Sequence, residues 1–97
     1  MGVRHGREYA DILKELTEAV RAIPGSYTFF EMEQEEWEAL GEPEKHEVME
    51  ALADDVFFGL AEQPVLEVGE GTITHHPKHH IIEVSAGDNV TRVIRLI

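Results

Sequence analysis

Apolar residues recur at helical spacing in the first quarter of the chain. From Tyr9 to Ile23 they stand three or four positions apart, which predicts a helix over 7–23 with one buried stripe. Pro24-Gly25 ends that helix. The aromatic stretch 26–32 that follows is rich in strand-forming residues, and we predict a strand there.

Two further helices are expected before the middle of the chain. Trp37 and Leu40 anchor a short helix over 34–40, and Pro43 suits the first turn of a longer one over 43–61. Phe58 is an aromatic residue on the solvent-facing side of this longer helix. Its inner face is formed by Val48, Met49, Leu52, Ala53, Val56, Phe57 and Leu60.

After Pro64 the pattern changes to that of β-strands. Residues 65–68, 72–75, 80–85 and 90–97 are rich in β-branched residues and are separated by turn-forming glycines, Pro77 and Asn89. The sequence therefore predicts a single α+β domain over 1–97 in two layers, with helices packed on an antiparallel sheet of about four strands. The expected order is α-β-α(α)-β-β-β.

Apolar residues occur on both faces of the last two strands. A register with Ala86 opposite Asn89 pairs Ile81 with Ile94, and it puts Leu96 on the same face as these two. One layer of helices covers only one face of a sheet. We therefore expect a homodimer through the second face, with Ile81, Ile94 and Leu96 in the interface.

The negative charge of the chain is concentrated in one third of it. The net charge is −12, and residues 31–62 hold twelve acids against Lys45 alone, a net of −11. Direct binding to nucleic acid is disfavoured because it needs clustered lysine and arginine side chains. We expect a basic protein partner on an acidic helical surface that includes Glu44, Glu47 and Asp54. An alternative is an acidic nucleic-acid mimic, which requires its carboxylates in one ridge: Glu33, Glu36, Glu44, Glu47 and Asp54.

Four of the six histidines lie in the stretch THHPKHH, residues 74–80. Pro77 suits the second position of a β-turn over 76–79, so His75 is expected opposite His80 and His76 opposite His79. Because side chains alternate between faces, the two histidine pairs point to opposite sides of the sheet.

A cross-strand pair of imidazoles can chelate zinc or nickel, but two ligands alone make a weak site. The pair His75 and His80 is the better candidate, His76 and His79 the second, and a third ligand would come from His46, Glu50 or a second subunit. A divalent transition metal, a pH sensor and a polar hairpin tip all remain open.

An enzymatic function is not supported by the sequence. His46 and Glu47 begin the zinc-protease motif, but the second histidine of that motif is Glu50. Ser26 and Ser85 lack a nucleophile elbow, and no catalytic residue stands out. No apolar run reaches the roughly 20 residues of a membrane span. The absence of cysteine fits a reducing compartment, so we expect a cytoplasmic interaction protein.

Overall fold

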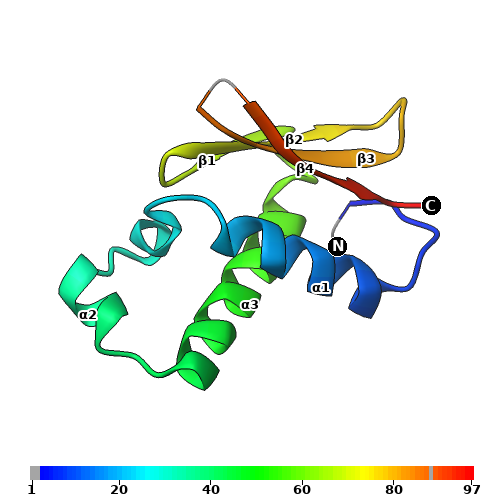
Figure 1. The fold of residues 1–97 in the computed structure, drawn as a ribbon. Helices are drawn as coiled ribbons and strands as arrows, with labels where there is room; N and C mark the ends of the chain where they lie inside the picture. The colour runs from blue at the N-terminus through cyan, green and yellow to red at the C-terminus, as the bar shows by residue number, and fades with distance from the viewer. Residues whose placement is uncertain (1–2, 88) are drawn as a thin grey trace.

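The computed structural model describes residues 3–87 and 89–97, and it has helices on one side of an antiparallel sheet (Figure 1). The expected two-layer α+β class is confirmed. None of the helices in the described ranges has the length and apolar character to cross a membrane. The elements in chain order are α1 (Tyr9–Arg21), the 3-10 helix η1 (Ser26–Phe30), α2 (Gln34–Glu38), α3 (Glu42–Gly59), β1 (Val65–Val68), β2 (Gly71–His76), β3 (Ile81–Ala86) and β4 (Asn89–Arg95).

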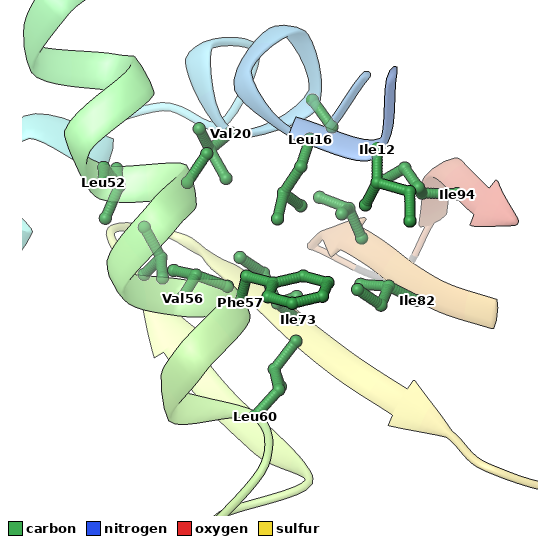
Figure 2. Close-up of a cluster of buried hydrophobic side chains, with 14 of the residues drawn as sticks. Ile12, Leu16, Val20, Leu52, Val56, Phe57, Leu60, Ile73, Ile82 and Ile94 are labelled. Atoms are coloured by element: carbon green, nitrogen blue, oxygen red, sulfur yellow. The ribbon is translucent and has the colours of Figure 1, made fainter. Parts of the chain in front are cut away.

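The core lies where α1 and α3 meet the sheet. In Figure 2, Leu16 of α1, Phe57 of α3 and Ile73 of β2 point into one cluster, and all three are almost fully buried. Each such side chain contributes about 1.5–3 kcal/mol when it leaves water, so this cluster is the main source of stability. Its largest members are Ile12, Leu16, Val20, Met49, Leu52, Val56, Phe57, Leu60, Ile73, Ile82, Ile94 and Leu96.

The segment 26–32 is not a strand, which corrects the expected order of elements. Its first five residues form η1, between Gly25 and Glu31, which both have left-handed backbone angles (φ 73° and 59°). The backbone of Pro24 is held by the β1–β2 turn, because its carbonyl accepts a hydrogen bond from Glu70 N at 3.0 Å. Local β-propensity is therefore overridden by tertiary contacts, and all four strands of the sheet come from the C-terminal third of the chain.

The sheet is a simple meander in the order β1-β2-β3-β4. At the start of β4, Ala86 pairs with Asn89, as expected from the sequence. A β-bulge between Val84 and Ser85 then shifts the register by one residue, so Ile82 pairs with Ile94. A one-residue shift moves every later side chain of the strand to the opposite face of the sheet. The bulge therefore decides which apolar residues of β4 are buried against the helices.

The bulge corrects the predicted interface residues. Ile94 and Leu96 are 0 % exposed in the core, whereas Val93 and Ile97 are 47 % and 57 % exposed. The expectation that Ile94 and Leu96 line the second face of the sheet is therefore wrong. Only Ile81, which is half-buried, lies on that face as predicted.

Candidate functional site

The face of the sheet that points away from the helices is not covered by any described part of the chain (Figure 1). We call it the outer sheet face. It carries three exposed valines, Val65, Val90 and Val93, with exposed fractions of 51 %, 55 % and 47 %. The full set is Val65, Glu67, Thr72, Thr74, His76, Ile81, Glu83, Ser85, Val90, Val93 and Arg95.

Both edges of the sheet are obstructed. At one edge, β1 is only four residues long. At the other, the bulge interrupts β4, and the N-terminal segment covers its end: Gly6 N and Arg7 N donate to Leu96 O at 2.7 and 2.9 Å. The Arg7 side chain also donates to Arg95 O at 2.9 Å. Short strands, bulges and covering segments all prevent pairing at an edge, so any contact made by the sheet uses its outer face.

The second candidate surface is formed by α2 and α3 and is strongly acidic. We call it the acidic helical surface: Glu33, Glu35, Glu36, Glu38, Glu44, Glu47, Glu50, Asp54 and Asp55, of which all but the half-buried Asp54 are exposed. Lys45 is the one lysine or arginine within residues 31–62, and its Nζ lies 5.4 Å from the centre of the Trp37 ring. Trp37 in turn stacks on Tyr27 with 5.6 Å between ring centres. The sequence does not reveal this aromatic pair, because the two residues lie on separate elements.

A groove of about 300 Å³ opens on this surface between α1 and α3. Its lining combines two apolar side chains, Leu13 and Ala51, with three carboxylates, those of Glu47, Glu50 and Asp54. The Tyr9 hydroxyl donates a hydrogen bond to Asp54. Burial, this hydrogen bond and the charges of Asp54 and Glu50 raise the pKa of Tyr9 far above its ordinary value. The phenol therefore stays neutral and acts as a donor that holds Asp54 in place.

The residues required by a nucleic-acid mimic do not form one ridge of free carboxylates. Glu44, Glu47 and Asp54 lie along α3, but Glu36 lies on α2 and Glu33 is the N-cap residue of α2. Glu33 and Glu36 also form a capping box, in which each side chain accepts a hydrogen bond from the backbone N–H of the other residue. These two carboxylates cap the N-terminus of α2, so their placement does not support the hypothesis of a nucleic-acid mimic.

The register of the histidine hairpin differs from the one expected. His79 N does donate to His76 O at 3.1 Å, which is the predicted turn, but His76 pairs with Ile81 and His75 with Ile82. The physical reason is Pro77. Two-residue hairpin loops need a positive φ at that position, and proline fixes φ near −65°. The loop takes two more residues, and His80 adopts a left-handed φ of 54°.

The cross-strand histidine pairs therefore do not form. His75 and His76 lie on opposite faces of β2, and His79 and His80 are exposed in the loop. His76 Nε2 lies 2.8 Å from Glu83 Oε1. Within the described ranges, no three histidine, aspartate or glutamate side chains are grouped so that they could hold a metal ion. His46 and Glu50, the proposed third ligands, both lie on α3, where His46 Nε2 is 3.5 Å from Glu50 Oε2.

His75 gives the hairpin a predictable response to pH. Its partial burial lowers its pKa from 6.5, and the neighbouring His76 and His80 add to this effect. The unfolded chain therefore binds the proton more readily than the folded one. The contribution of His75 to stability is complete above pH 6.5 and is lost as the pH falls through the lower folded-state value.

We expect an NMR titration to give a midpoint for the His75 imidazole below 6.5. The free energy of unfolding of a His75→Gln variant should fall less than that of the wild type between neutral and mildly acidic pH. A His75 midpoint at or above the ordinary value, or equal pH dependence in the two proteins, would contradict this account.

Comparison of the chain with protein-family models, curated proteins and solved structures gave no match, so the two surfaces have to be interpreted from their own chemistry.

Proposed function

We propose that this protein is a non-enzymatic interaction domain whose acidic helical surface binds a basic segment of a partner protein. The observation that carries the proposal is the density of carboxylates on α2 and α3, most of which form no ion pair with a lysine or arginine of the described residues. Within residues 31–62, Glu42 pairs with Arg21, His46 lies near Glu50, and Lys45 is placed over Trp37. Such a surface attracts cations and repels phosphate backbones.

The mixed apolar and acidic lining of the α1–α3 groove supports a peptide-like partner over a free cation. A lysine or arginine side chain has a hydrocarbon stem and a charged end, and a groove lined by Leu13, Ala51 and carboxylates matches both parts. The proposed compartment, the cytoplasm, rests on the lack of cysteine alone.

Isothermal titration calorimetry with a lysine- and serine-rich peptide tests the proposal. Binding should be measurable at low salt and lost at about 1 M salt, where the Debye length is about 3 Å. The double variant Glu44→Gln/Glu47→Gln should bind about threefold to tenfold more weakly, because each exposed ion pair contributes up to about 1 kcal/mol.

The matched control is the double variant Glu67→Gln/Glu70→Gln, which makes the same change in net charge outside α2 and α3. Its affinity for the peptide should stay close to that of the wild type. Equal weakening in the two variants would mean that the peptide responds to net charge only, and the proposed surface would then be wrong.

A further inference from the structure

The outer sheet face differs from the rest of the molecule in its charge. Its charged residues are Glu67, Glu83 and Arg95, and Glu83 is hydrogen-bonded to His76. The acidic helical surface belongs to the helix layer, on the other side of the sheet (Figure 1). The outer sheet face is thus a nearly neutral, partly apolar region on a protein with a net charge of −12.

We infer that this face binds a second copy of the same chain. A basic partner is drawn to α2 and α3 instead, and a phosphate-rich partner such as nucleic acid or a membrane surface would find only Arg95 among the charged residues of the face to bind it. The remaining kind of partner presents a nearly neutral, partly apolar surface of its own. Another copy supplies this surface, and contact there keeps the two acidic helical surfaces apart.

The register of the sheet lets two valines on opposite edges of the face meet across a two-fold axis. Val65 on β1 and Val93 on β4 lie in one row across the sheet, because Val65 pairs with Thr74, Thr74 with Glu83, and Glu83 with Val93. A two-fold axis parallel to the central strands places β1 of one copy over β4 of the other. Val65 of each copy then meets Val93 of the other, and this apolar contact occurs twice.

The size of the face indicates a weak association. Four strands spaced about 4.8 Å apart and about six residues long cover roughly 20 Å by 20 Å, or about 400 Å² per copy. Stable interfaces bury about 800 Å² per partner. We therefore expect a dissociation constant between about 1 μM and 1 mM rather than a permanent dimer. The obstructed edges limit growth beyond two copies, because further strands cannot be added to the sheet.

Analytical ultracentrifugation of the full chain tests this inference. The weight-average mass should rise with concentration from 11.0 kDa towards twice that value. Val93→Lys should weaken association at least about tenfold, since it puts a charge into both of the Val65–Val93 contacts. Phe58→Lys is the control: it makes the same change in charge at an apolar residue of similar exposure (45 %) on α3, and it should leave the association intact.

A charge pair tests the two-fold arrangement itself. Val65→Lys and Val93→Asp should each weaken the dimer, whereas the double variant should regain most of the lost affinity through two Lys–Asp contacts. A wild-type chain that stays monomeric up to about 1 mM overturns the inference. Loss of association in Phe58→Lys but not in Val93→Lys also overturns it, as does a double variant as weak as the singles. Peptide binding by α2 and α3 is measured on the monomer at low concentration, so either proposal can fail without the other.

Discussion

Replacing Phe57 by alanine should cost about 3–5 kcal/mol of the free energy of unfolding, the range for truncating a large buried aromatic side chain. Phe57 is 1 % exposed, and its ring packs edge-on against His5 and Tyr9 with centroid distances of 5.3 and 4.9 Å. A folded domain has about 5–15 kcal/mol in total, so the variant should lose a large fraction of its stability. Urea denaturation followed by circular dichroism measures the loss.

The neighbouring residue provides the control. Phe58 is 45 % exposed, and its ring centre lies 6.0 Å from that of Phe57 and 6.4 Å from that of Tyr9. Phe58→Ala should therefore cost no more than about 1 kcal/mol, as is usual for exposed positions. If Phe57→Ala is too unstable to measure, Phe57→Leu gives a smaller loss in the same direction. Equal losses at the two positions would contradict the placement of the core.

Ile94→Asp is expected to prevent folding, whereas Val93→Asp is expected to leave the fold intact. Ile94 is fully buried opposite Ile82, so a carboxylate there loses the apolar contact and also its hydration, together several kcal/mol. Val93 is half-exposed and faces Glu83, where a second negative charge costs roughly 1 kcal/mol or less.

This pair of variants tests the β-bulge directly. With an unbulged register, Val93 would face the helices and Ile94 would face solvent, so the two effects would be exchanged. Far-ultraviolet circular dichroism and thermal unfolding of both variants give the answer. A folded Ile94→Asp protein together with an unfolded Val93→Asp protein would show that the shift between Val84 and Ser85 is absent.

The helices and the fold class could be predicted because their signals are local and repeated. The apolar spacing from Tyr9 to Ile23 and the inner face of α3 each follow one period over several turns. Pro43 and the glycines mark their ends correctly to within about two residues, the ordinary uncertainty for helix boundaries. The strands of the C-terminal third were likewise visible in their β-branched residues.

The register of the sheet could not be predicted, because it depends on single residues that break the alternation. Continuing the alternation from Val90 puts Ile94 on the wrong face, and only the packing of Ile94 and Leu96 under α1 favours a bulge over a straight strand. The register of the β2–β3 hairpin could have been predicted, since Pro77 restricts the length of its loop. Its fixed φ rules out the two-residue loops and thereby the facing histidine pairs.

The candidate surfaces were predicted only in part for the same reason. The acidic helical surface follows from composition and helical spacing, and Glu44, Glu47 and Asp54 do lie along α3. The groove beside Asp54 needs the crossing of α1 and α3, which brings Leu13 next to Ala51. The apolar residues of the outer sheet face are Val65, Ile81, Val90 and Val93 in place of the predicted set with Ile94 and Leu96.

The two proposals together divide the roles of the two surfaces. In them, the helix layer binds a basic partner through its excess negative charge, and the outer sheet face joins two copies with their acidic sides pointing outward. Because the groove and the outer sheet face use different residues, a dimer would present two acidic helical surfaces at once. Two linked binding sites raise the effective concentration for a partner with two basic segments.

A dilution series of amide NMR spectra from about 1 mM to about 10 μM tests this division most directly. The account predicts concentration-dependent shifts at the outer sheet face, centred on the row from Val65 to Val93, and constant shifts for α2 and α3. Spectra that do not change with concentration, or changes confined to α2, α3 or the edge of β4, would contradict it.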